Sequence, residues 1–156
     1  GKPGGEGMEV IWQCGKYYKN AIDGFMEKAE ADGLPVKGII HSDFIGRMEL
    51  AYAAADLVIS RSGASSVSEL CAAHKAVIFV PSPNVAEDHQ THNAMALVRK
   101  DAGILIKDSE AEEKLMETAC SLIGDRDKIA SMEKNIATLA KRDAAMTIAE
   151  EVYRII

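Results

Sequence analysis

The segment from Asp56 to Ala73 combines small residues, hydroxyl groups and one carboxylate in a pattern suited to binding a phosphorylated ligand. An apolar run ends at Ser60, and it is followed by the short stretch Arg61-Ser62-Gly63-Ala64-Ser65. Small side chains let a ligand approach the backbone closely. Where such a loop enters a helix, the first N–H groups lack an internal acceptor and carry partial positive charge. The segment therefore predicts a seat for an anion such as a pyrophosphate.

The same segment also has a purely structural interpretation. Ser66 and Glu69 are spaced as a capping box, in which the serine begins a helix and the glutamate folds back onto the serine N–H. The local sequence favours neither interpretation over the other. If Glu69 instead points past the phosphates, its carboxylate can accept hydrogen bonds from a ribose diol, as acidic residues do in dinucleotide sites.

A second polar segment, Asp88 to Asn93, follows the fourth apolar run of the chain. Gln90 and Asn93 carry amides and His89 carries an imidazole, and these groups offer both donors and acceptors to sugar hydroxyls. A metal site made by Asp88, His89 and His92 is an alternative, although a third strong ligand beside the two histidines is not obvious. A solvated helix start is the other alternative.

Apolar runs that alternate with amphipathic stretches indicate the elements that position these segments. The runs predicted as strands are Glu9–Cys14, Val36–His41, Asp56–Ser60, Ala76–Val80 and Gly103–Ile106. The stretches predicted as helices are Tyr17–Ala31, Asp43–Ala54 with Asp43 as a possible N-cap, Ser66–Ala73, Glu87–Lys100, Glu110–Ile123, Asp125–Lys141 and Asp143–Ile156.

Strands that alternate with helices imply crossover connections and a parallel sheet. Because the predicted strands are continuous apolar runs, helices should cover both faces of that sheet. We therefore predict a Rossmann-like, doubly wound α/β domain with a helical C-terminal tail. In such sheets, ligands bind outside the carboxyl ends of the strands, so the loops after Cys14, His41, Ser60 and Val80 are the candidates.

Composition limits the classes of function. The chain has 156 residues, enough for one domain, and a net charge of −6, which favours neither a nucleic-acid partner nor an anionic lipid surface. Its three cysteines are odd in number, far apart and set among apolar residues, which indicates reduced, buried thiols. No run approaches the roughly 20 apolar residues of a membrane span, and no signal peptide is visible.

Three motifs, in this order and spacing, resemble the C-terminal domain of MurG-type UDP-N-acetylglucosamine transferases of peptidoglycan synthesis: RSGASSVSELCAA, VIFVPSP and EDHQTHNA. The upstream segment FIGRMELAYAAADLVISRSG adds support, because the family also has an aromatic–isoleucine pair, a methionine and an apolar helix there. The resemblance runs from about Trp12 to the end and is strongest from Phe44 to Asn93. It implies the C-terminal half of a B-type glycosyltransferase, which has two Rossmann-like domains.

The resemblance also implies roles for individual residues. The backbone of Ile45 would read the uracil edge, although composition alone favours Ile45 and Met48 as core residues. Ser66 and its neighbouring N–H groups would hold the pyrophosphate, Glu69 the ribose hydroxyls and Gln90 the donor sugar. The full implied donor-binding set is Phe44, Ile45, Met48, Ser62, Gly63, Ala64, Ser65, Ser66, Val67, Ser68, Glu69, His89, Gln90 and Asn93. No cofactor and no metal are expected.

The activity that the resemblance implies is inverting transfer of N-acetylglucosamine from UDP-N-acetylglucosamine to undecaprenyl-pyrophosphoryl-N-acetylmuramoyl-pentapeptide, the step from lipid I to lipid II. The lipid-linked acceptor and the membrane would be contacted only through an N-terminal domain. The implied location is peripheral, at the cytoplasmic face of the bacterial inner membrane. No nucleic acid is expected as a partner.

The chain departs from the family at its start, where the family has a first strand and a phosphate loop similar to GGSxGA. We therefore expect residues 1–156 to be one donor-binding domain, excised from a longer protein and lacking that loop and the acceptor domain. It follows that no catalytic residue is assigned, that donor affinity should be weak, and that the fragment alone should not transfer sugar.

Two alternatives remain open. One is a different UDP-sugar enzyme of the same fold, such as an epimerase or another glycosyltransferase. An epimerase needs acidic and basic groups around C2 of the sugar, and no such cluster is evident near Gln90. The other is a non-catalytic UDP-sugar-binding subunit that a partner chain completes.

Overall fold

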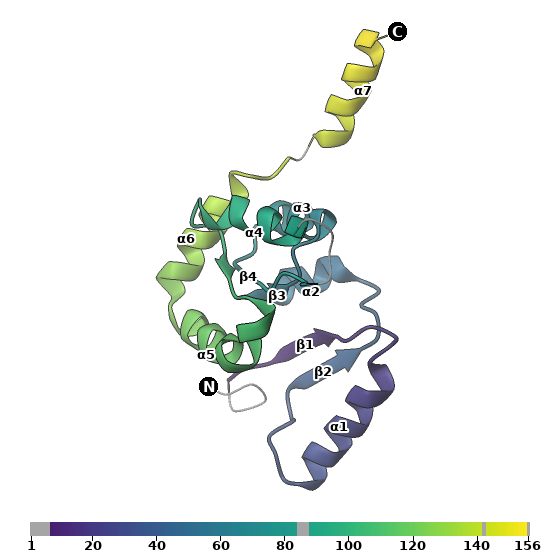
Figure 1. The fold of residues 1–156 in the computed structure, drawn as a ribbon, viewed down its shortest axis with the longest axis vertical. Coiled ribbons are helices and arrows are strands. Elements are labelled where there is room, and N and C mark those ends of the chain that lie inside the picture. The colour runs from purple at the N-terminus through teal and green to yellow at the C-terminus, as the bar shows by residue number, and fades with distance from the viewer. Residues whose placement is uncertain (1–6, 84–87, 142, 156) are drawn as a thin grey trace. The chain divides into compact units, whose positions relative to one another are not determined.

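The computed structural model describes residues 7–83, 88–141 and 143–155 (Figure 1). The chain forms two compact units, residues 1–54 and 55–156. Each unit alternates strands with helices, and each strand pair in the described residues is parallel. The predicted parallel α/β class is therefore confirmed. The ladders join the described strands in two groups rather than one, with strand orders β1-β2 and β3-β4-β5.

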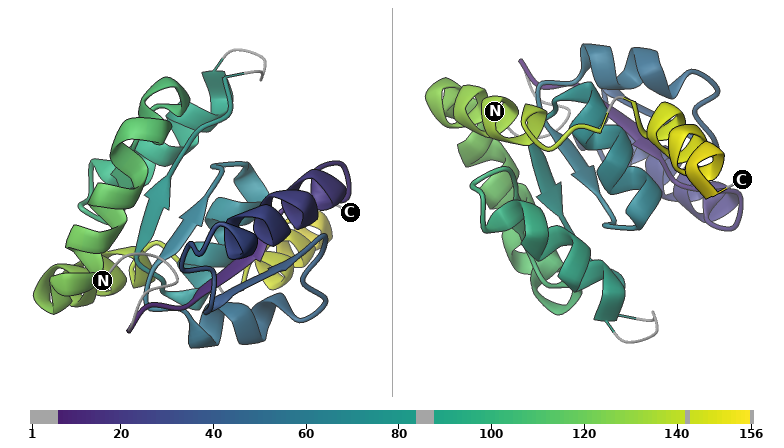
Figure 2. Two further views of the ribbon diagram at one scale, coloured as in Figure 1. Left: turned by 90° about the horizontal axis from the view of Figure 1, so that it is seen from below. Right: turned by 90° about the horizontal axis from the view of Figure 1, so that it is seen from above.

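The first unit is a pair of parallel strands with α1 lying along it (Figures 1 and 2). Its elements are β1 (Val10–Gln13), α1 (Lys19–Ala31), β2 (Ile39–Ser42) and α2 (Met48–Ala54). His41 of β2 lies 3.4 Å from the carboxylate of Asp23 in α1. Within α1, that carboxylate accepts a hydrogen bond from Lys19, which raises the pKa of the lysine ammonium. The approach of His41 to Asp23 therefore joins α1 to β2.

The second unit contains the larger core. Its elements are β3 (Val58–Ser60), α3 (Ala64–Ala73), β4 (Val77–Phe79), α4 (His89–Val98), β5 (Ile104–Leu105), the 3-10 helix η2 (Asp108–Glu110), α5 (Ala111–Gly124), α6 (Arg126–Ala137) and α7 (Ala144–Ile155). Central strand β4 is completely buried, as expected for a strand flanked by two others and covered by helices. All described side chains of α7 are exposed.

Alternating side chains of β4 face different helices. Ile78 packs in one cluster with Leu122 of α5 and with Ile129 and Met132 of α6. Successive strand residues point to opposite faces of a sheet, so Val77 and Phe79 lie on the other face. Burying side chains of this size stabilises the unit by about 1.5–3 kcal/mol each. Because β4 is packed on both faces, it provides a rigid support for the loops that follow β3 and β4.

Element boundaries differ from those predicted where loops contribute to the site. The second strand begins at Ile39 rather than Val36, and α2 begins at Met48, so Asp43 is not its N-cap. Helix α3 begins at Ala64, two residues before the predicted start at Ser66. The predicted helix start at Glu87 falls outside the described residues, and α4 begins at His89.

The cysteines have different environments. Cys71 is buried, and burial raises the pKa of its thiol, whereas Cys14 and Cys120 are half-buried. All three are free thiols. The expectation that all three thiols are buried holds only for Cys71.

Gly103, the residue before β5, lies close to side chains of β4. A Cβ added to Gly103 would lie 3.0 Å from Cε2 of Phe79 and 3.3 Å from Cγ1 of Val77. We expect Gly103→Ala to lower the free energy of unfolding by about 1–3 kcal/mol, because core overpacking forces neighbours to shift. Urea unfolding followed by circular dichroism measures the change.

Gly124→Ala is the matched control, because a Cβ there meets nothing within 4 Å. It should leave stability unchanged or raise it by up to about 1 kcal/mol, as alanine is the better helix former. Equal effects of the two substitutions would contradict the close packing of Gly103.

Candidate functional site

The N-terminus of α3 lies directly after the carboxyl end of β3. Its N-cap, Gly63, has extended backbone angles and makes no side-chain capping hydrogen bond. The first helical hydrogen bond runs from the Val67 N–H to the Gly63 carbonyl, at 3.0 Å. The N–H groups of Ala64, Ser65 and Ser66 therefore have no acceptor within the helix, and they carry its partial positive charge. This arrangement is suited to an anion.

The structure does not support the capping-box interpretation. Because α3 begins at Ala64, Ser66 is the third residue of the helix and cannot be its N-cap. Glu69 lies in the second turn, is exposed, and shares a helix face with Ser65 and Ser66 through the three- and four-residue spacing. The Ser68 hydroxyl donates to the Ala64 carbonyl at 2.9 Å, so it bonds to its own helix.

Ser62 is completely buried, and its polar groups bond to the first two turns of α4. Its hydroxyl donates to the Gln90 carbonyl at 2.8 Å, and its N–H donates to the Gln90 side-chain Oε1 at 3.3 Å. Its carbonyl accepts from the Asn93 Nδ2 at 3.1 Å. The loop after β3 is thereby fastened to the start of α4.

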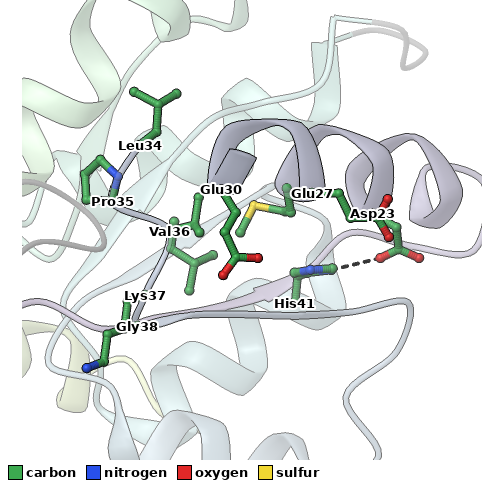
Figure 3. A pocket seen from close by; sticks show the side chains of 11 residues that line it. Asp23, Glu27, Glu30, Leu34, Pro35, Val36, Lys37, Gly38 and His41 are labelled. Atoms are coloured by element: carbon green, nitrogen blue, oxygen red, sulfur yellow. Dashed lines mark ion pairs between the residues drawn. The ribbon is translucent and has the colours of Figure 1, made fainter. Parts of the chain in front are cut away.

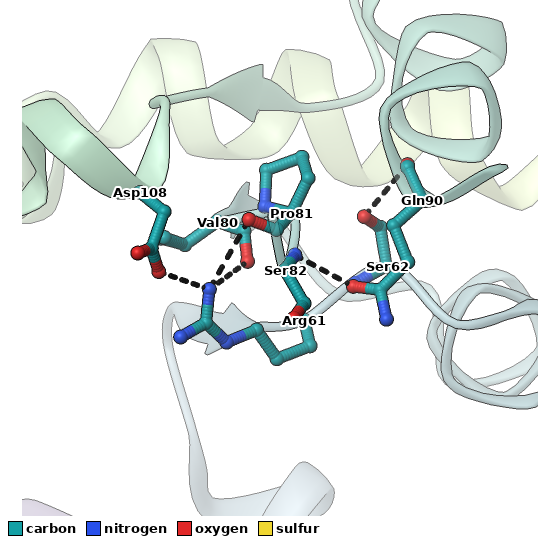
Figure 4. Close-up of polar contacts among 7 residues, drawn as sticks. All are labelled: Arg61, Ser62, Val80, Pro81, Ser82, Gln90 and Asp108. Atoms are coloured by element: carbon teal, nitrogen blue, oxygen red, sulfur yellow. Dashed lines mark hydrogen bonds and ion pairs between the residues drawn. The ribbon is translucent and has the colours of Figure 1, made fainter. Parts of the chain in front are cut away.

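The Gln90 side chain also holds the loop after β4. Its Oε1 accepts a second hydrogen bond, from the Ser82 N–H at 3.0 Å (Figure 4). One carboxamide oxygen therefore joins loops that are 20 residues apart in the sequence and that follow neighbouring parallel strands. The predicted phosphate and sugar segments are brought together through this group.

Arg61 also forms hydrogen bonds at the carboxyl ends of these strands. Its Nη1 donates to the carbonyls of Val80 and Pro81, at 3.0 and 3.2 Å, and to the Asp108 carboxylate at 2.5 Å (Figure 4). These acceptors follow β4 and β5, so one guanidinium links the segments that follow three strands. The geometry makes Arg61 a structural clamp beside the loop.

Two substitutions separate the contributions of this clamp. Arg61→Ala should lower the free energy of unfolding by about 1–3 kcal/mol, because buried carbonyls lose a charged donor. Asp108→Asn should cost less than about 1 kcal/mol, since half-exposed ion pairs contribute little. Urea unfolding at low and high salt measures both effects. An Asp108 effect equal to the Arg61 effect, and abolished by salt, would contradict this assignment.

Phe44, Ile45 and Met48 lie in the first unit, after the carboxyl end of β2. Phe44 is 68% exposed. The Ile45 N–H donates to the side-chain Oε1 of Gln13 at 2.8 Å, and Gln13 is the last residue of β1. The segment after β2 is therefore fastened to the end of β1 by a side-chain amide.

His89 is the first residue of α4 and is exposed, and Asp88 before it adopts a left-handed backbone with φ of +53°. Within the described ranges, no group of three or more His, Cys, Asp or Glu side chains could hold a metal. The alternative of a metal site at Asp88, His89 and His92 is therefore not supported. Nor is any described helix long and apolar enough to cross a membrane.

The first unit also contains an open groove of about 640 Å³ beside α1 (Figure 3). Asp23, Glu27 and Glu30 line it together with residues 34–39 and His41. Three carboxylates would repel the phosphates of a nucleotide, and most of the lining residues precede or begin β2 rather than follow it. The groove is therefore a poorer candidate for a nucleotide site than the carboxyl ends of the strands.

Sequence reasoning missed the partners of the predicted residues. Gln13, Ser82 and Asp108 received no role, yet each bonds to a segment of the candidate site. The rule that ligands bind at carboxyl ends of parallel strands directs attention to these loops. It cannot pair residues across loops, because such pairs depend on which strands become neighbours.

Residues 4–148 match the family described as the glycosyltransferase family 28 C-terminal domain. Similar proteins include the UDP-N-acetylglucosamine--N-acetylmuramyl-(pentapeptide) pyrophosphoryl-undecaprenol N-acetylglucosamine transferases of Parabacteroides distasonis and Porphyromonas gingivalis. The first is 51% identical over 149 residues, which are 96% of this chain and 39% of that relative. The second is 49% identical over 156 residues, which are 100% of this chain and 40% of that relative.

Among solved structures, the crystal structure of Acinetobacter baumannii MurG is similar, with a TM-score of 0.79 and 26% sequence identity. The match covers 94% of this chain and 41% of that one. It confirms the predicted Rossmann-like fold of the C-terminal half of a B-type glycosyltransferase. The chain thus spans about 39% of the length of the curated relatives that it matches. Taken with the family match over residues 4–148, these likenesses show that the chain belongs to the glycosyltransferase family 28 C-terminal domain.

Proposed function

We propose that this chain binds the donor of a glycosyltransferase, UDP-N-acetylglucosamine, at the carboxyl ends of its strands. The observation that carries the proposal is the start of α3, where the N–H groups of Ala64, Ser65 and Ser66 lack helical acceptors. A pyrophosphate there accepts hydrogen bonds from these N–H groups and meets the positive end of the helix. Gly63 lacks a side chain that would keep the phosphates away.

Glu69 would bind the ribose. It lies one turn further along the helix face that carries Ser65 and Ser66, so a nucleotide with its phosphates at the helix start would extend its ribose toward this carboxylate. A carboxylate accepts hydrogen bonds from two neighbouring hydroxyls, whereas it repels phosphate. Val67 and Ser68 would contribute to this surface mainly through the backbone, since the Ser68 hydroxyl bonds within α3.

Gln90 and His89 would face the donor sugar from the start of α4, and the segment of Phe44, Ile45 and Met48 would bind the uracil. Because the Ile45 N–H already donates to Gln13, the Ile45 carbonyl is the backbone group suited to a uracil N–H. Phe44 is exposed and could cover the base.

For the longer protein, we propose the reaction stated in the names of the relatives. N-acetylglucosamine would pass from UDP to N-acetylmuramyl-(pentapeptide) pyrophosphoryl-undecaprenol, with inversion at the anomeric carbon. The helix start would stabilise the charge that develops on the departing UDP, because its dipoles are already oriented before reaction. The acceptor, the catalytic base and contact with the cytoplasmic face of the membrane would belong to a further domain, and residues 1–156 to one donor-binding domain.

The ribose role predicts a difference between two nucleotides. The 156-residue chain should bind UDP weakly but saturably, and 2′-deoxy-UDP about two- to tenfold more weakly, because one hydrogen bond to Glu69 is lost. Glu69→Ala should weaken UDP binding and abolish the preference for UDP. Calorimetric or NMR titration measures both affinities.

Glu117→Ala serves as the control. It removes an exposed carboxylate from α5 and changes the net charge by the same amount as Glu69→Ala. It should leave both affinities unchanged. An undiminished preference for UDP in the Glu69 variant would refute the ribose role. The absence of saturable UDP binding by the unaltered chain would refute the proposed function itself.

A further inference from the structure

We propose that Ser62 and Asn93 are positioning residues that orient the Gln90 carboxamide, so that Gln90 presents only its NH₂ group to the donor sugar. This inference rests on the proposed function and specifies which end of the Gln90 carboxamide meets the sugar. It assigns to Ser62 and Asn93 a role behind the binding surface rather than contact with the donor. The unit formed by Ser62, Ser82, Gln90 and Asn93 is called the amide latch below.

The polarity of the Gln90 carboxamide follows from its two partners. The backbone N–H groups of Ser62 and Ser82 both point at the same side-chain atom, at 3.3 and 3.0 Å. Both are donors, so that atom must be the acceptor oxygen. Rotating the amide by half a turn would set its NH₂ against two N–H groups and leave all of these donors unsatisfied.

The NH₂ group of Gln90 is consequently the end that remains for a ligand. It makes no hydrogen bond to any of the residues drawn in Figure 4, and none is formed with the rest of the described chain. Gln90 is half-buried at the start of α4, so this group lies at the surface of the candidate site. It can donate to a hydroxyl or carbonyl oxygen of a sugar, but it cannot accept.

Ser62 sets the position of the helix start that carries Gln90. It is completely buried, so its side chain cannot reach a ligand. Its hydroxyl and its N–H both bond to Gln90, one to the main chain and one to the side chain. A residue held at two points on the same partner has little freedom to rotate relative to it.

Asn93 completes the latch from one turn further along α4. Its Nδ2 donates to the Ser62 carbonyl at 3.1 Å, which satisfies the last backbone group of this buried residue. A buried carbonyl without a donor is unfavourable, so loss of the Asn93 amide should shift Ser62 and with it the Gln90 carboxamide. The effect on a ligand would be indirect and confined to the sugar end.

The first measurement concerns the free chain and needs no ligand. Asn93→Ala should change the NMR signals of the Ser62 and Ser82 backbone amides and of the Gln90 NH₂ group, and it should speed hydrogen exchange at Ser62. Asn135→Ala is the matched control, because Asn135 makes the same kind of bond, from its Nδ2 to the Asp101 carbonyl at 3.1 Å, outside the latch. It should leave those signals unchanged.

The second measurement is the ratio of affinities for UDP-N-acetylglucosamine and UDP, which isolates the contribution of the sugar. Asn93→Ala should lower this ratio about two- to tenfold, the effect of one misplaced hydrogen bond, while UDP affinity stays within about twofold. A general loss of structure would lower both affinities together. Ser62→Ala, which removes only the hydroxyl, should act in the same direction and is less disruptive to folding.

Gln90→Glu separates anchoring from donation. A carboxylate still accepts from the Ser62 and Ser82 N–H groups, so both amides should remain hydrogen-bonded in the spectra. It cannot donate to the sugar, so the ratio of affinities should fall about two- to tenfold. Added negative charge repels UDP more strongly than UDP-N-acetylglucosamine, because the terminal phosphate of UDP carries an additional charge, so repulsion alone would raise the ratio and cannot account for a fall.

Three results would overturn the inference. One is an unchanged ratio in the Gln90→Glu chain, and another is an unchanged ratio in both the Asn93 and Ser62 variants. The third is free-chain spectra in which Asn93→Ala leaves the Gln90 NH₂ signals unmoved. If the unaltered chain binds neither ligand, the proposed function fails, and the free-chain spectra still decide whether the amide latch exists.

Discussion

Backbone polar groups at the carboxyl ends of buried parallel strands need hydrogen-bond partners, and the candidate site is built around that need. Ser62 lies two residues after the end of β3, and its N–H, carbonyl and hydroxyl are all buried. Neighbouring strands cannot supply partners beyond their own ends, so side chains of Gln90 and Asn93 do. The carbonyls after β4 are bonded in the same way by Arg61.

This arrangement leaves one set of backbone donors for a ligand. Hydrogen bonds to α4 hold Ser62, and the chain then turns at Gly63 and enters α3 without a capping side chain. The first N–H groups of α3 are therefore available where the strands end. A capped helix would have used these donors internally, and the site would have lost its attraction for phosphate.

The fold could be predicted to a large extent because its signals are local. Continuous apolar runs such as Val77–Phe79 indicate buried strands, and the amphipathic stretches between them indicate the crossover helices of a parallel sheet. The rule for strand ends indicated the loops of the candidate site, whereas the individual site residues were predicted from the resemblance to a family. The start of α3 was misplaced by two residues, since Ser66 and Glu69 have capping-box spacing and local sequence does not show that Gly63 already completes the turn.

By itself, the sequence determined the parallel α/β class, the order of the elements and the segments that carry hydroxyl, amide and carboxylate groups. Those properties follow from hydrophobic periodicity and residue chemistry within a few positions of each other. Only the tertiary structure decided that Gln13 bonds to Ile45, that Gln90 joins two loops, and that Ser62 is buried behind the surface. Such pairs join residues that are distant in the chain, and they form only when the neighbouring strands and their covering helices have packed.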